Sequence, residues 1–296
     1  MSLTPTFIDL GPTPYAPAYA EQLRRVDEVL ASRERAKEGG GTPEVGRVLL
    51  VEHVPPVITV SRRAGSADHL LASRDTLAKM GIELHETDRG GDITYHGPGQ
   101  LVVYPILDLN VLGLGLHAYM RMLEEVVIRV LARFGVKGVR DASATGVWVG
   151  TLPTNGTPTV REGLRADAPG SDSTPRGRGI GEKPLPDGRG SVDAAASAKV
   201  CAMGVRVKRW VSMHGLALNV TTNLEHFGLI VPCGLVGRPV TSLQNLLGGS
   251  SPPMDEVKRV MVEEFAAAVG EAAQLAGESR LGEPTYLGPT HGEPGP

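Results

Sequence analysis

The stretch from residue 151 to residue 197 limits the possible folds of this chain more than any other feature of its sequence. It is dominated by Pro, Gly, Ser, Asp and Arg and holds few large apolar residues, so it cannot bury enough surface to order itself. The segments on either side, GVWVG before it and AKVCAMG after it, are apolar and typical of strands. We therefore expect the flanking strands to pair as a hairpin whose tip carries a long disordered insertion.

Helix patterns occur on both sides of this insertion. Apolar residues recur at helical spacing over 18–37, 73–81, 118–135 and 251–277. Glycines follow or end the first three runs, and Ser73 is a suitable N-cap for the second. The sequence therefore predicts four helices distributed along the whole chain.

Strand patterns interleave with these helices. Runs rich in β-branched residues predict strands over 47–53, 56–61, 100–109, 146–150 and 198–220. Pro55 and Pro56 lie between the first two runs and predict a hairpin there. The order predicts an α/β fold with α+β character, built on a mixed, antiparallel-rich sheet.

Charge and composition exclude several classes of function. The chain has 30 Lys and Arg against 33 Asp and Glu, with no densely basic stretch, so no nucleic-acid partner is expected. The sequence shows no apolar run long enough to span a bilayer and no signal-peptide pattern, so no membrane association is expected. Two distant cysteines form no disulfide framework, and the sequence has no zinc-binding spacing. These features predict a cytoplasmic protein with reduced thiols and no metal.

Cys233 is the candidate nucleophile. It lies between Pro232, which restricts the backbone, and Gly234, which frees it, so the chain bends there and presents the thiol. A packed, inert thiol is the alternative. Lys199 opens an apolar strand, where desolvation lowers the pKa of a lysine and allows it to exchange a proton with a thiol. Cys201, in the middle of that strand, is predicted to be a core residue.

The segment RGGDITYHGPGQ, residues 89–100, is the most specific local motif. Arg89 offers a cationic fork to a phosphate or carboxylate, the two following glycines allow close approach of a ligand, and His96 precedes a Gly-Pro-Gly turn. A tight loop with a core histidine is the alternative. The motif matches neither the dinucleotide fingerprint nor the P-loop, so no nucleotide site is indicated. His214, before Gly215, is a second candidate base, with a structural histidine as the alternative.

Three blocks, RGGDITYHGPGQLVVYPILDL, KVCAMGVRVKRWVSMHGLALNV and PCGLVGRPVTSL, resemble the signature blocks of the lipoyl(octanoyl) transferases of lipoate biosynthesis, in the order of that family. The resemblance covers residues 7–265 apart from the insertion. It implies a biotin/lipoyl protein ligase-like fold. It also implies one catalytic domain over 1–276, which the insertion at 151–197 interrupts. The tail at 277–296 is similar in composition to the insertion and is likewise expected to be disordered.

The resemblance also implies an activity, partners and site residues. The activity is transfer of an octanoyl group from octanoyl-acyl-carrier protein to a lysine of lipoyl domains, in 2-oxoacid dehydrogenase complexes and in the glycine cleavage H protein, without a cofactor. Cys233 carries the acyl group as a thioester, and Lys199 assists. The implied substrate contacts are Arg89, Gly90, Gly91, Asp92, Ile93, Thr94, Tyr95, His96, Ala202, Met203, Gly204, Gly215, Leu216 and Ala217.

Three other functions stay open. An ATP-dependent lipoate or biotin protein ligase shares the implied fold but needs an adenylate site. A cysteine hydrolase using His96 or His214 would release free octanoate. A non-catalytic module that binds lipoyl domains would tolerate the loss of Cys233.

Overall fold

A computed structural model describes residues 4–150, 197–232, 238–276 and 286–287 of the chain. Almost all of the expected insertion at 151–197 and of the expected tail at 277–296 lies outside the described residues. The same holds for Cys233 and the four residues after it.

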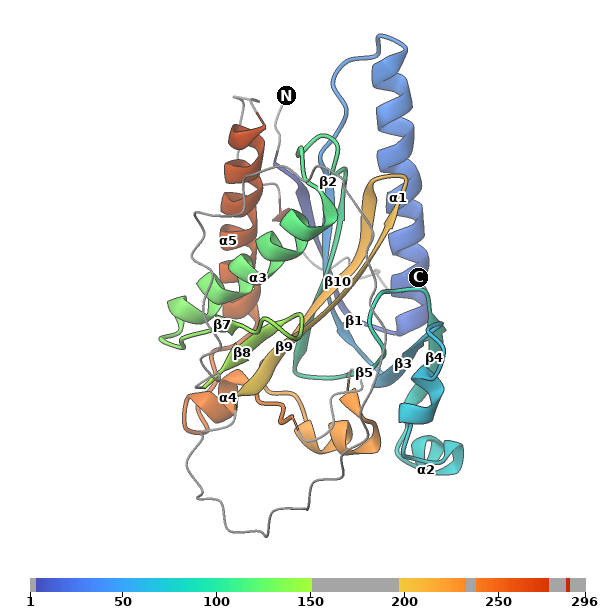
Figure 1. Ribbon diagram of the computed structural model, residues 1–296, viewed down its shortest axis with the longest axis vertical. Coiled ribbons are helices and arrows are strands. Elements are labelled where there is room, and N and C mark those ends of the chain that lie inside the picture. The colour runs from blue at the N-terminus through green and yellow to red at the C-terminus, as the bar shows by residue number, and fades with distance from the viewer. Residues whose placement is uncertain (1–3, 151–196, 233–237, 277–285, 288–296) are drawn as a thin grey trace, which may run out of the picture.

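The main body of the fold is a mixed sheet of eight strands (Figure 1). Strand β1 runs parallel to both of its neighbours, and the remaining pairs are antiparallel, which confirms the mixed, antiparallel-rich sheet. Val149 pairs with Ala198, so the hairpin predicted around the insertion is also confirmed. In spatial order the strands are β11 (Tyr286–Leu287), β1 (Thr6–Thr13), β2 (Gly46–His53), β6 (Gln100–Leu107), β10 (Val211–Asn219), β9 (Ala198–Lys208), β8 (Val147–Val149) and β7 (Val139–Arg140).

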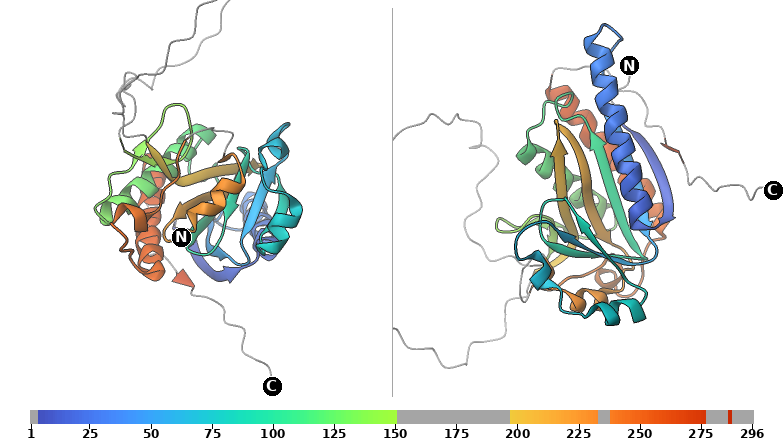
Figure 2. Two further views of the ribbon diagram at one scale, coloured as in Figure 1. Left: turned by 90° about the horizontal axis from the view of Figure 1, so that it is seen from below. Right: turned by 90° about the vertical axis from the view of Figure 1, so that its right-hand side faces the viewer.

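Helices cover both faces of this sheet (Figures 1 and 2). On one face α3 (Leu116–Arg133) and α5 (Met254–Leu275) enclose the main apolar core. There the rings of Phe7 and Phe265 meet edge to face, with 6.2 Å between their centroids. On the other face α1 (Tyr15–Lys37) encloses a second apolar cluster with residues of β2, β6 and β10.

A second, three-stranded sheet lies beside the large one, in the order β4 (Glu83–Thr87), β3 (Val57–Ser61) and β5 (Ile93–His96). It packs with short helical segments around a third apolar cluster. These segments are η1 (Ser66–His69), α2 (Arg74–Lys79) and η2 (Leu224–Leu229). One further short helix, α4 (Leu243–Leu246), precedes α5.

The hairpin predicted between 47–53 and 56–61 is wrong. Strand β2 pairs with β1 and β6 in the large sheet, whereas β3 pairs with β4 and β5 in the small one. Both strands are buried along nearly their whole length, so neither has the polar face that would show which partner it takes. The Pro55-Pro56 turn therefore carries the chain from one sheet to the other.

Local residues explain where the first two helices begin. Helix α1 begins at Tyr15, three residues earlier than predicted, because Pro17 falls in the first turn, where no backbone donor is needed. Ser73 caps α2 as predicted, accepting from the Thr76 amide at 3.1 Å. In the described ranges, no helix combines the length and the apolar character of a membrane span.

Candidate active site

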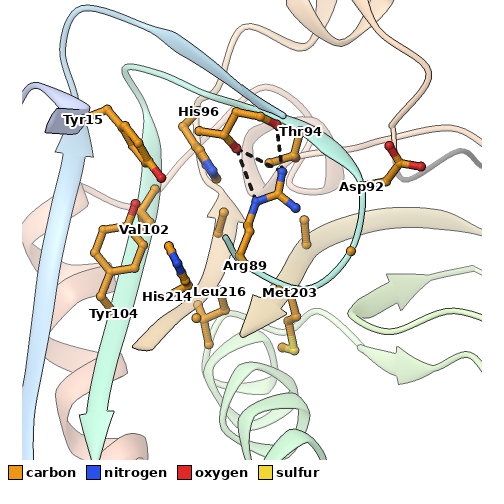
Figure 3. Close-up of a pocket in the computed structure, with 16 residues that line it drawn as sticks. Tyr15, Arg89, Asp92, Thr94, His96, Val102, Tyr104, Met203, His214 and Leu216 are labelled. Carbon is orange, nitrogen blue, oxygen red and sulfur yellow. Dashed lines mark hydrogen bonds between the residues drawn. The ribbon is translucent and has the colours of Figure 1, made fainter. Parts of the chain in front are cut away.

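A pocket opens between the large sheet, the small sheet and the segment that joins β4 to β5 (Figure 3). Its empty volume, which includes space open to solvent, is about 490 Å³. The lining residues are Tyr15, Thr59, Arg89, Gly91, Asp92, Thr94, His96, Val102, Tyr104, Ala202, Met203, Gly204, His214, Gly215, Leu216 and Ala217.

The pocket collects most of the substrate contacts that the resemblance implies. Segments 89–96, 202–204 and 215–217 are distant in sequence but meet here because β9 pairs with β10, and because the Gly90 amide donates to the carbonyl of Val205 at 2.9 Å. Gly90, Ile93 and Tyr95 do not line the pocket. The binding role of the whole set stays a prediction.

Alternation along β5 explains two of these exceptions. Successive side chains on a strand point to opposite faces, so Thr94 and His96 face the pocket while Ile93 and Tyr95 face away. Ile93 and Tyr95 belong to the apolar cluster of the small sheet, where the Tyr95 ring meets that of Phe227 with 5.4 Å between centroids. Their contacts in the structure are thus core contacts.

Arg89 ties the pocket wall to the small sheet. Its guanidinium donates to the carbonyl and hydroxyl oxygens of Thr59, with Nη2 at 2.9 Å and 3.0 Å from them, and to the Gly90 carbonyl at 3.2 Å. The cationic fork expected to meet a ligand therefore lies against Thr59, where it also fixes the course of the segment between β4 and β5.

Asp88, which directly precedes the 89–100 motif, bonds to several polar side chains next to the pocket. Its carboxylate accepts from His214 Nε2 at 2.8 Å and from the Tyr19 hydroxyl at 3.1 Å, and it forms an ion pair with Arg206. His214 has a φ of 56°, in the left-handed region, and its amide donates to Gln22 Oε1 at 2.8 Å. His214 is therefore fixed through both its side chain and its backbone.

The sequence motifs missed four residues of this region: Tyr15, Thr59, Asp88 and Tyr104. Of these, only Tyr104 could have been predicted from the sequence. It follows Val102 by two positions on β6, so both side chains lie on the same face of the strand and both line the pocket. The other three reach the site through tertiary packing of α1, β3 and the loop after β4.

The imidazoles around the pocket are neutral near pH 7. Burial lowers the pKa of His53 to about 4 and the pKa values of His96 and His214 to about 3. His96 Nδ1 lies 2.7 Å from Gln100 Oε1, and His53 Nε2 lies 2.7 Å from the Tyr104 hydroxyl. These rings orient their neighbours as hydrogen-bonding groups and carry no positive charge.

Lys199 lies at the start of β9, nearly buried, with 7% of its surface exposed. Its Nζ is 4.7 Å from the centroid of the Trp148 ring. Its backbone joins the chain that follows Cys233, donating to the Pro239 carbonyl and accepting from the Thr241 amide, both at 2.9 Å. It is not among the residues that line the pocket, and Ala202 is the first residue of β9 that does so.

Of the two cysteines, only Cys201 lies in the part of the chain that the structure describes. Cys201 is fully buried, and burial raises its thiol pKa to about 12, which confirms the prediction of a core residue. The proposed nucleophile, Cys233, and the amides of Gly234 and Leu235 lie outside the described residues.

Comparison with known proteins identifies the family. The model of the lipoyl protein ligase A/B catalytic domain matches residues 19–266. The chain belongs to this family. The octanoyltransferase of Bacteroides fragilis is 40% identical over 256 residues, which is 86% of this chain and 94% of that protein. The octanoyltransferase of Caldicellulosiruptor bescii is 38% identical over 265 residues, which is 89% of this chain and 92% of that protein.

Solved structures of lipoyl protein ligases share the fold. Lipoate-protein ligase A bound with ATP superposes with a TM-score of 0.54 at 12% identity, over 97% of this chain and 90% of that one. The bipartite lipoate protein ligase of Thermoplasma acidophilum gives 0.50 at 13%, over 92% and 91%. The lipoyl protein ligase catalytic fold is thus confirmed, and the octanoyltransferase relatives make this family member an acyltransferase of the octanoyltransferase type.

Proposed function

We propose that this octanoyltransferase moves an octanoyl group from octanoyl-acyl-carrier protein to a lysine of a lipoyl domain, through a thioester on Cys233. The proposed acceptors are the lipoyl domains of 2-oxoacid dehydrogenase complexes and the glycine cleavage H protein. The proposed compartment is the cytoplasm, where thiols stay reduced. Family membership supports these partners in general terms.

The backbone link between Lys199 and Pro239 carries the proposal. Cys233 precedes Pro239 by six positions, and an extended chain spans at most about 3.6 Å per residue, so about 22 Å is the largest separation that the chain permits between them. The backbone link therefore sets an upper limit on the separation of two residues that are 34 positions apart in sequence. That limit supports the proposed pairing of the Lys199 amine with the Cys233 thiol.

The proposed chemistry has two balanced acyl transfers. In the first, Lys199 takes the thiol proton, the Cys233 sulfur attacks the donor carbonyl, the donor carbon–sulfur bond breaks, and the departing thiol receives the proton. In the second, the acceptor amine attacks the acyl-enzyme, an amide bond forms, and Cys233 leaves with the amine proton passed through Lys199. Exchange of one thioester for another is nearly isoenergetic and amide formation is downhill, so the reaction consumes no ATP.

The pocket is the proposed site of the octanoyl chain. Ala202 follows Lys199 by three positions, about 10 Å along an extended strand. An acyl group attached near Lys199 then extends along the face of the sheet where Val102, Ala202 and Ala217, which are cross-strand neighbours, supply apolar surface. Burial of its methylene groups at ~0.8 kcal/mol each gives several kcal/mol of binding energy and a preference for chain length.

Intact-mass measurement after incubation with octanoyl-acyl-carrier protein tests the proposal. We expect the parent protein and Cys201→Ala to gain one octanoyl mass, and Cys233→Ser to lose transfer to a lipoyl domain. An adduct that maps to Cys201 would mean that the nucleophile is assigned wrongly.

The same assay separates the alternatives. A ligase would need free octanoate and ATP, and a binding module would be indifferent to Cys233→Ser. A hydrolase would release octanoate without an acceptor. The low pKa values of His96 and His214, about 3, make them poor proton acceptors for that hydrolysis near pH 7.

A further inference from the structure

The Trp148 side chain lies against two cations. Its ring, 1% exposed on β8, has Lys199 Nζ at 4.7 Å and Arg238 Cζ at 3.7 Å from its centroid. Its Nε1 donates to the Ala144 carbonyl at 3.3 Å, which orients the indole. Both cation distances are within the range of a cation–π interaction, and Trp is the strongest aromatic partner for one.

Arg238 is itself held in place. Its guanidinium forms an ion pair with Asp141 and donates to the Ser197 hydroxyl at 3.0 Å. The Asp141 carboxylate also accepts from the amide and hydroxyl of Ser143 at 2.8 Å and 2.7 Å. The indole thus packs against the Arg238 guanidinium, and Asp141 and Ser197 fix the position of that guanidinium.

A lysine side chain has many rotamers, whereas proton exchange with a thiol requires a closely defined geometry. An apolar residue at position 148 would fill the core but would not attract an ammonium group. We propose that Trp148 is a positioning residue, whose ring holds the Lys199 side chain for exchange with Cys233 while Arg238 fixes the ring. This inference rests on the proposed roles of Lys199 and Cys233.

Fluorinated tryptophan tests the proposal without changing the shape of the core. Fluorine atoms withdraw electron density from the ring face and so weaken its attraction for a cation. In a Trp210→Phe background, where position 148 carries the sole indole, we expect the single-turnover rate of Cys233 acylation at saturating donor to fall stepwise from unsubstituted to trifluorinated tryptophan. The expected total is about three- to tenfold, with the KM for octanoyl-acyl-carrier protein unchanged.

A thermodynamic cycle with Lys199→Ala decides whether Trp148 acts through Lys199. In that background we expect fluorination to leave the residual acylation rate unchanged. Phe265→Leu is the control for loss of a core ring, because Phe265 is fully buried on α5 and its ring packs against that of Phe7. Its acylation rate, corrected for folded protein, should equal that of the parent.

The possible results test the positioning role of Trp148 and the proposed function separately. A rate that is independent of fluorination, or one that falls equally with and without Lys199, overturns the positioning role and leaves Trp148 as a core residue. If the parent forms no thioester on Cys233, the proposed function itself fails. If Lys199→Ala acylates at the parent rate, the proposed role of Lys199 fails. Either result rejects the positioning role with it.

Discussion

An amine and a guanidinium carry the same charge near pH 7, but only the amine can release its proton there. We therefore expect Lys199→Ala to lower the rate of Cys233 acylation at every working pH, by about a hundredfold or more, and Lys199→Arg to give no rescue. Quench-flow measurement with octanoyl-acyl-carrier protein gives both rates. Full activity in Lys199→Arg would leave Lys199 with an electrostatic role alone.

The buried imidazoles make stability depend on pH. Burial lowers the pKa of His53, His96 and His214 to between about 3 and about 4 in the folded protein, whereas an unfolded histidine titrates near 6.5. As the pH falls below about 6.5, the unfolded chain binds protons that the folded protein does not. Stability is therefore full above about pH 6.5 and is lost toward pH 4, by up to about 1.4 kcal/mol per pH unit for each ring.

Replacing one of these rings should reduce that dependence. We expect His53→Gln to show a shallower fall in the free energy of unfolding between pH 6.5 and pH 4.5 than the parent, measured by urea titration. His117, exposed on α3, supplies the matched control His117→Gln. Equal slopes for the parent and His53→Gln would mean that His53 is already protonated in the folded protein.

Sequence motifs located the pocket but not all of its residues. The glycines and His96 of 89–96 indicated a ligand-binding loop because those residue types suit close approach, and the loop does line a pocket. The sequence motifs did not predict Asp88 and Thr59 as site residues, because no motif or periodic pattern in their local sequence indicates a role there. Their place near the site follows from the course of the segment after β4, where Asp88 bonds to His214 of β10 and Arg89 bonds to Thr59 of β3.

Among the elements, β6 and β10 leave no room between them for a side chain at Gly215. A Cβ at this position would lie 2.2 Å from the Val103 carbonyl oxygen and 2.5 Å from Pro105 Cδ. Gly215→Ala must therefore push the two central strands apart, and we expect it to lower the free energy of unfolding by about 1–3 kcal/mol, measured by urea denaturation.

Gly228→Ala is the matched control for that experiment. A Cβ at Gly228 would have no heavy atom within 4 Å, so this change should alter stability by less than about 0.5 kcal/mol. Equal stability in the two alanine variants would contradict the close approach of β6 and β10.

Element prediction succeeded where periodicity was strong and failed where burial was complete. Helix α3 lies within two residues of its predicted start and end because it is amphipathic along its length. The partner of β2 was assigned wrongly because its buried residues suit either sheet. The short strand β7, and β1 with its internal Gly11 and Pro12, lack the periodic pattern that would have indicated them.

For the molecule as a whole, the paired ends of β8 and β9 make the segment between them a candidate for removal. Val149 lies opposite Ala198, so a short turn is enough to connect the strands. Residues 151–196 lie outside the described part of the chain. We expect deletion of residues 153–195, with a short Gly-containing turn in their place, to preserve folding and the rate of octanoyl transfer, and to raise thermal stability slightly because a shorter loop closes at lower entropic cost.

A docking role for the segment would give a different result. If Arg176, Arg178 and Lys183 bind an acidic partner, the deleted protein will fold but show a sharply raised KM for acyl-carrier protein or for the lipoyl domain. A full-length variant with those three residues changed to Gln separates the loss of charge from the loss of length.

The order of strands in the large sheet has a consequence during synthesis. Strand β10 enters between β6 and β9, but β6 ends at Leu107 and β10 begins only at Val211. Translation proceeds at about 5–20 residues per second, so the edge of β6 that later pairs with β10 stays unpaired for some 5–20 seconds on the ribosome. Synthesis of residues 151–197 accounts for much of that interval. Every residue of β6 is buried in the finished protein, so the waiting edge combines apolar side chains with unpaired backbone. The nascent chain is therefore most prone to aggregate, and most in need of a chaperone, before translation reaches Asn219.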